Sequence, residues 1–98
     1  MIAYTPQATR QVADLRRHYE DLERINAIEA LDAALHAAEQ RIANNPLLGL
    51  TAPRPYPHVA CPGRLWTKAG RYWIAYNPMQ PPIIVGVFYE TADIPRRL

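Results

Sequence analysis

Three basic side chains lie close together in the last third of the chain, at Arg64, Lys68 and Arg71. The same third holds side chains that can donate or accept a proton: Tyr72, Tyr76, Tyr89 and Glu90. Metal-independent cleavage of RNA needs this combination, because an acid and a base move protons while cations stabilise charge on the phosphate. The segment therefore indicates one candidate chemistry, that of a metal-independent ribonuclease.

The aromatic residues of this segment allow two interpretations. Trp66 and Trp73 can stack on exposed nucleic-acid bases. Alternatively, they pack in the protein together with Tyr72 and Tyr76, as aromatic residues on strands usually do. We expect packing for at least half of these four residues, which leaves few aromatic rings for a ligand.

No other catalytic or cofactor motif is evident in the sequence. The four glycines are far apart, which excludes a glycine-rich phosphate loop. His18, His36 and His58 do not have the spacing of metal ligands. Cys61 is the single cysteine and cannot form an internal disulfide. His58 lies three residues away as a possible base, but no third group is evident, so catalysis by Cys61 is not expected. We therefore expect no metal and no cofactor.

The composition predicts one folded domain over residues 1–98, with 49% hydrophobic and 20% charged residues. Residues 45–98 carry six basic and two acidic side chains, whereas residues 1–44 carry five basic and seven acidic ones. The C-terminal half is thus expected to contact an acidic partner or nucleic acid. The single cysteine favours a cytoplasmic location. No signal-peptide pattern and no membrane-length apolar run is found, so no membrane partner is expected.

The elements that must position these residues begin with a helix. Thr5 is a good N-cap and Pro6 suits the first helical position, so the helix should start there. Apolar residues then recur at steps of three and four along two stretches, at Ala8, Val12, Leu15, Tyr19 and Leu22, and at Ile28, Leu31, Leu35, Ala38 and Ile42. This periodicity predicts two helices, each with one apolar face.

The joint between the helices is less defined. Asn26 with Glu29 predicts a capping pair at the start of the second helix, and Pro46 predicts its end near Asn45. Two matching stripes favour an antiparallel hairpin. One long bent helix is the alternative, because residues 21–25 contain no glycine or proline. Acidic residues at 20, 21 and 23 favour a break, since they oppose the dipole at a helix C-terminus.

Alternating patterns predict four strands, near residues 2–5, 64–68, 71–77 and 83–89. The last of these is apolar on both faces, which places it in the middle of a sheet or under helices. Its pairing should begin after Pro81-Pro82, because proline lacks the N–H of the ladder. Residues 46–63 are proline-rich and favour an ordered connector over a ligand for a proline-binding module. The class is α+β, with a strand, a helical hairpin and a three-stranded antiparallel meander packed on the helices.

Four segments carry a family likeness by their order and spacing. They are Thr5-Pro6-Gln7-Ala8 with Asp14-Leu15, Asn45-Pro46-Leu47-Leu48-Gly49, Gly70-Arg71-Tyr72-Trp73-Ile74-Ala75-Tyr76, and Glu90-Thr91-Ala92-Asp93-Ile94-Pro95-Arg96-Arg97-Leu98. Together they span nearly the whole chain, which resembles the RelE/ParE superfamily, the toxins of bacterial type II toxin–antitoxin and plasmid-stabilisation systems. The last segment is similar to the H-E-x-x-D-x-P-R-x-L tails of the ParE-like branch, with Tyr89 in place of the histidine.

The resemblance implies the fold just described and a cognate antitoxin that wraps the toxin. RelE-like members cut mRNA on the ribosome, whereas ParE-like members are associated with inhibition of DNA gyrase without catalysis. The RelE branch relies on basic residues along the second and third strands and at the end of the fourth. Here Trp73 occupies the expected third-strand arginine position, with Arg71 two residues earlier, and the fourth strand ends in Phe88-Tyr89-Glu90. These departures favour the ParE-like branch.

We therefore expect a ParE-like toxin with no catalytic residue, whose target-binding residues are basic: Arg64, Lys68, Arg71, Arg96 and Arg97. The expected partners are a cognate antitoxin, in a toxin–antitoxin hetero-oligomer, and DNA gyrase. One alternative is a ribosome-dependent mRNA endoribonuclease that uses Arg64, Lys68, Arg71 and Tyr89. A second alternative is a non-toxic member that acts only as a binding partner. An exposed sheet edge and apolar helix faces would suit the antitoxin segment.

Overall fold

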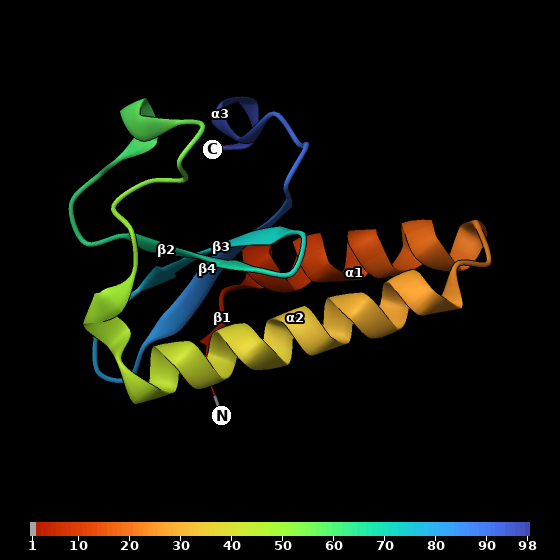
Figure 1. Cartoon of the computed structure of the whole chain (residues 1–98), viewed down its shortest axis with the longest axis horizontal. Helices are drawn as coiled ribbons and strands as arrows, with labels where there is room; N and C mark the ends of the chain where they lie inside the picture. Colours follow the sequence, from red (N-terminus) through yellow and green to blue (C-terminus); the bar gives the residue numbers. More distant parts are fainter. Residues whose placement is uncertain (1) are drawn as a thin grey trace.

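The computed structural model describes residues 2–98 and consists of two long helices packed on a four-stranded mixed sheet (Figure 1). The elements in chain order are β1 (Ala3–Tyr4), α1 (Pro6–Asp21), α2 (Ile25–Asn44), η1 (Pro46–Leu48), η2 (Pro57–Val59), β2 (Leu65–Ala69), β3 (Tyr72–Asn77), β4 (Ile83–Tyr89) and α3 (Ile94–Arg97). The α+β class is confirmed. Within the described range, no helix is long and apolar enough to cross a membrane.

Helix α1 starts as its sequence predicts. The Thr5 hydroxyl accepts a hydrogen bond from the Ala8 backbone N–H at 3.1 Å, and Pro6 is the first helical residue. This bond satisfies one of the amides that have no partner within the helix. The apolar stripe then directs Ala8 and Tyr19 into the core, while Val12 and Leu15 pack against it. The start of α1 is therefore determined by local chemistry.

The hairpin joint is a break rather than a bend. Glu23 has a left-handed φ of 54°, the Glu23 N–H donates to the Glu20 carbonyl at 3.0 Å, and the Arg24 N–H donates to the Tyr19 carbonyl at 2.8 Å. This pair of bonds is the Schellman motif, which usually has glycine at the left-handed position. The Arg24 guanidinium lies 5.9 Å from the centre of the Tyr19 ring, which adds a cation–π contact to the turn.

The predicted capping pair of Asn26 and Glu29 is wrong. Helix α2 begins at Ile25, with Arg24 as its N-cap and no capping bond from a side chain. The backbone carbonyl of Arg24 instead accepts from Ala27 at 3.1 Å and Ile28 at 3.3 Å. The chain resumes helical geometry immediately after the turn, so Asn26 is already inside the helix. The end of α2 at Asn44, before Pro46, is as predicted.

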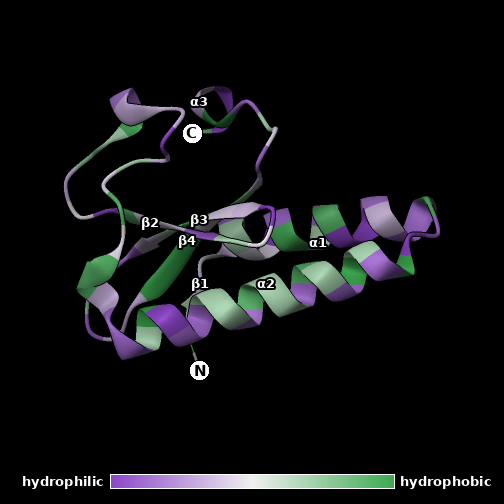
Figure 2. Cartoon of the chain, in the orientation of Figure 1, coloured by the Kyte–Doolittle hydropathy of each residue, from purple (hydrophilic) through white to green (hydrophobic). Residues whose placement is uncertain are grey.

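The sheet has the strand order β1-β4-β3-β2. Strands β2, β3 and β4 form the expected antiparallel meander, while β1 runs parallel to β4 and makes the sheet mixed. Pairing of β4 begins at Ile83, directly after the two prolines, and β4 lies inside the sheet as expected. Figure 2 shows much of β4 in green, the hydrophobic end of the scale, which fits a strand covered on both faces.

Both faces of the sheet are buried, each by a different layer. The helices cover the face that carries Tyr72, Ile74, Tyr76 and Ile84. The other face belongs to a second cluster built from Trp66, Trp73, Ala75, Phe88 and Ile94, with Tyr56 and Val59 packed against it. The residues of the proline-rich connector and of α3 thus form the second cover. The connector thus packs on the sheet through Tyr56 and Val59 although it contains little regular structure.

The outer edge of β2 is closed. Leu50 forms a bridge with Trp66, through backbone bonds of 2.8 and 2.7 Å. The Arg41 guanidinium donates to the Lys68 carbonyl and, at 3.2 Å, to the Thr67 hydroxyl. The expectation of an exposed sheet edge is therefore wrong for β2, because the connector and α2 already use groups that an added strand would need.

Glu23→Gly should stabilise the fold by about 1 kcal/mol and raise Tm by about 5 °C, because glycine adopts the left-handed geometry without strain. Thermal unfolding followed by circular dichroism measures this shift. Glu29→Gly is the matched control, since it removes the same charge from an exposed position inside α2. The control should lose about 1 kcal/mol. Equal destabilisation of both variants would contradict the proposed role of Glu23.

Candidate functional site

A cleft of about 700 Å³ lies at one end of the sheet. The helical hairpin extends beyond the sheet, and the segment after β4 rises from the same end (Figure 1). The turn between β2 and β3 lies between these two walls. Basic and aromatic residues line the cleft: His18, Tyr19, Arg24, Arg71, Tyr72, Tyr89 and Arg97. Its apolar lining is supplied mainly by Leu15, Ala27 and Ala30.

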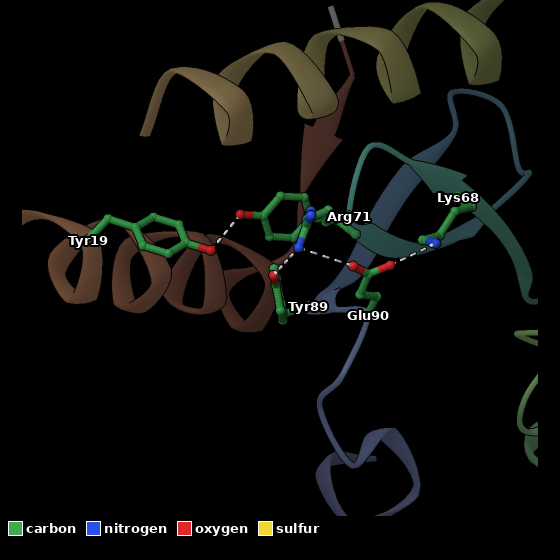
Figure 3. A network of polar contacts seen from close by, with 6 residues as sticks. Tyr19, Lys68, Arg71, Tyr89 and Glu90 are labelled. Atoms are coloured by element: carbon green, nitrogen blue, oxygen red, sulfur yellow. Dashed lines mark hydrogen bonds and ion pairs between the residues drawn. The ribbon is translucent and has the colours of Figure 1, made fainter. Parts of the chain in front are cut away.

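Arg71 is positioned by the tight turn between β2 and β3. Gly70 takes a φ of 56° there, and the Arg71 carbonyl accepts a bond of 2.8 Å from the Glu90 N–H. The Arg71 guanidinium donates to the Tyr89 hydroxyl at 3.2 Å and lies 3.8 Å from the Glu90 carboxylate (Figure 3). The bond to Tyr89 raises the pKa of Arg71, and the charge of Glu90 adds to this. Arg71 therefore stays cationic at the mouth of the cleft.

Glu90 joins two of the predicted cations. Its carboxylate is 3.3 Å from the Lys68 ammonium on one side and faces Arg71 on the other (Figure 3). Lys68 also lies 5.4 Å from the centre of the Trp73 ring, and Arg54 lies 5.9 Å from it. Half-buried Lys68 is thus held by a carboxylate and an aromatic ring, which reduces its capacity to bind a ligand phosphate.

Three tyrosines connect α1 to the end of the sheet. The hydroxyls of Tyr19 and Tyr72 are 2.6 Å apart and buried, and the rings of Tyr72 and Tyr89 meet edge to face at 5.6 Å. Burial raises the pKa of Tyr72, and its bond to Tyr19 acts in the same direction. The Tyr72 hydroxyl therefore stays protonated and occupied by Tyr19, while Tyr89 remains half-exposed to the cleft.

The structure brings together only part of the predicted site. Lys68, Arg71 and Tyr89 meet around Glu90, and Arg97 lines the same cleft. Arg96 does not line it and is exposed beside Asp93, 3.4 Å away. The described cavities that Arg64 borders are two smaller ones, with Ala75 and Phe88 in one and Cys61 and Met79 in the other. Arg64 is therefore separated from the cations around Glu90.

The proton-transfer and stacking roles considered for other aromatic residues are not supported. Trp66 and Trp73 are buried in the cluster on the far face of the sheet, so neither can stack on a base. The Tyr76 hydroxyl donates to the Pro46 carbonyl at 2.7 Å, and burial raises its pKa. Packing, the alternative interpretation, is confirmed for both tryptophans and for Tyr72 and Tyr76.

The helical hairpin contributes residues that sequence reasoning missed. His18, Tyr19 and Arg24 line the cleft, although the expected binding residues were all in the C-terminal half. The only sequence signal for a binding role of Arg24 is a weak one, namely that a basic residue lies between two predicted helices. No sequence signal links Tyr19 to Tyr72, because the pairing depends on how the hairpin packs on the sheet.

No family model matches the chain, and no curated protein matches it significantly. Among residues 2–98, no three histidine, cysteine, aspartate or glutamate side chains are grouped so that they could hold a metal ion. The polar side chains that line the cleft include three guanidinium groups, the His18 imidazole and the Tyr89 hydroxyl.

Tyr19→Phe and Tyr72→Phe should each destabilise the fold by about 1–2 kcal/mol, because either change leaves one buried hydroxyl without its partner. The double variant should cost about as much as one single change, since both hydroxyls are then gone. Urea unfolding of the four proteins measures the coupling. As a control, Tyr56→Phe takes the place of Tyr19→Phe in a second cycle with Tyr72→Phe. The two losses of stability should add there, because the Tyr56 hydroxyl makes only a 3.4 Å contact, with the Ala92 carbonyl. Additive costs for Tyr19 and Tyr72 would contradict the pairing.

Proposed function

We propose that this chain is a ParE-like toxin of a type II toxin–antitoxin system, which binds DNA gyrase and is neutralised by a cognate antitoxin. The order of strand, helical hairpin and antiparallel meander is compatible with that family. The target surface would be the mouth of the cleft, where Arg71 and Arg97 are exposed. Arg64, Lys68 and Arg96 contribute less in this proposal, because they are separate from the cleft or already engaged.

The observation that carries this proposal is that the basic side chains on and beside the strands do not gather at one point. A phosphoryl-transfer site concentrates free cations around one phosphate. Here Lys68 and Arg71 share the Glu90 carboxylate, and Arg64 borders other cavities. The third-strand position that would hold an arginine in a RelE-like enzyme is buried Trp73. This arrangement favours binding of a macromolecule over catalysis on RNA.

The purified protein should block DNA supercoiling by gyrase, or cause cleaved DNA to accumulate, at a stoichiometric excess. Arg71→Ala and Arg97→Ala should each raise the half-inhibitory concentration about fivefold, as for charges at the edge of a binding surface. Arg10→Ala is the matched control, because Arg10 is exposed on α1 and does not line the cleft. Supercoiling that is unchanged at about a tenfold molar excess of this protein over gyrase would reject gyrase as the target, because a tight inhibitor is saturating at that ratio.

A ribosome-dependent ribonuclease is the second candidate, favoured by one contact. The Tyr89 hydroxyl accepts a bond from Arg71 and lines the cleft together with His18. Such a hydroxyl and imidazole are groups that can move protons.

Under this candidate, primer extension on translated mRNA should show cleavage at codon-linked positions after the protein is induced. The cuts should disappear in both Tyr89→Phe and Arg71→Ala, because the first removes the hydroxyl and the second its cationic partner. Intact mRNA in growth-arrested cells would reject the nuclease. Normal growth after induction without antitoxin would reject both toxic mechanisms and leave a role in binding alone.

A further inference from the structure

A second, smaller concavity lies beside the cleft, at the tip of the helical hairpin. This hollow of about 330 Å³ is bordered by Glu23, Arg24, Ile25, Asn26 and Ala27. Three of these residues, Arg24, Asn26 and Ala27, also line the cleft. The cleft and the hollow therefore border each other at the start of α2. We call the two concavities together the tip groove. A ligand that contacts both must reach from the hairpin tip into the cleft, as a peptide segment can.

The charge of the tip groove is unbalanced where it widens into the cleft. Arg24, Arg71 and Arg97 come from three separate parts of the chain, and among residues 2–98 no aspartate or glutamate lines the cleft. Glu90 partly neutralises Arg71 from outside, but no acidic side chain of the described chain lies within ion-pair distance of Arg24 or Arg97. Glu23 borders only the hollow at the hairpin tip. Anionic groups are therefore the complementary ligand.

Exposed apolar side chains accompany these arginines. Ile25 is 67% exposed inside the hollow, and Leu22 is 53% exposed on the same turn. Leu15, Ala27 and Ala30 extend the apolar surface into the cleft. A phosphate or a nucleic-acid backbone would pair with the arginines but leave Ile25 and Leu22 in water. A peptide with both acidic and apolar side chains covers both features.

The closed edge of β2 also favours binding of a peptide in the tip groove. Leu50 and Arg41 occupy groups on that edge, so an incoming segment cannot extend the sheet there as an added strand. The tip groove needs no free strand edge, because its arginines and apolar residues are side chains already directed outward.

We propose that the tip groove binds an acidic, amphipathic segment of a partner protein. The carboxylates of the segment pair with Arg24, Arg71 and Arg97, and its apolar side chains cover Ile25 and Ala27. The proposal depends on the proposed function only for the identity of the partner, which would then be the antitoxin.

The test is selection from a phage-displayed library of random peptides of about 16 residues, enough to span such a groove. Selected peptides should be enriched in aspartate and glutamate together with leucine or isoleucine. A synthetic copy labelled with fluorescein should bind with a Kd that rises about fivefold in Arg24→Gln and in Arg97→Gln. Ile25→Ser should weaken binding to a similar degree, whereas the exposed control Arg10→Gln should not change it.

Three outcomes would overturn the proposal: selected peptides without acidic residues, acidic peptides that bind Arg24→Gln/Arg97→Gln as well as the unaltered protein, or peptides insensitive to Ile25→Ser. A single-stranded oligonucleotide of about 16 nucleotides is the competing ligand. Its binding with the same arginine dependence, and no acidic peptide selected, would assign the groove to nucleic acid. The gyrase assay is read independently, so inactivity there leaves the peptide result standing, and the reverse also holds.

Discussion

Burial of the sheet on both faces is the constraint on which the rest of this small structure depends. Strands β3 and β4 carry large apolar side chains on both sides, and two helices can cover only one of them. The second cover is assembled from the proline-rich connector and the C-terminal turn, around fully buried Trp66 and Ile94. In a chain of 98 residues, this leaves little material for a closed internal cavity.

The position of the cleft follows from this layering. The hairpin is longer than the sheet, so its tip projects past the strand ends, and the chain leaving β4 must turn across the opposite face to reach the second cluster (Figure 1). The two layers diverge at this end, and the tyrosine contacts of Tyr19, Tyr72 and Tyr89 close the base of the gap. The candidate site therefore lies at the junction of the two cores.

The same junction determines which cations are free. Glu90, one residue beyond β4, pairs with both Lys68 and Arg71 at the end of the sheet (Figure 3). The Lys68 ammonium also lies 5.4 Å from the centre of the Trp73 ring. Arg24 and Arg97, which belong to the turn and to α3, remain directed at the cleft without an acidic neighbour within ion-pair reach among the described residues. This arrangement is the basis for the proposal that the cleft binds acidic groups through its guanidinium side chains.

Local chemistry in the sequence determined the elements: the Thr5-Pro6 start of α1, the end of α2 before Pro46, and the start of β4 after its prolines. These signals act over a few residues, through capping, ring geometry and side-chain periodicity. Tertiary structure alone decided the closed edge of β2 and the membership of the site. Arg64 and Arg71 are close in sequence yet border different cavities, whereas Tyr19 and Tyr72 are 53 residues apart and share a hydrogen bond. Such contacts depend on how the hairpin packs on the sheet, and that packing is a property of the whole core rather than of any short segment.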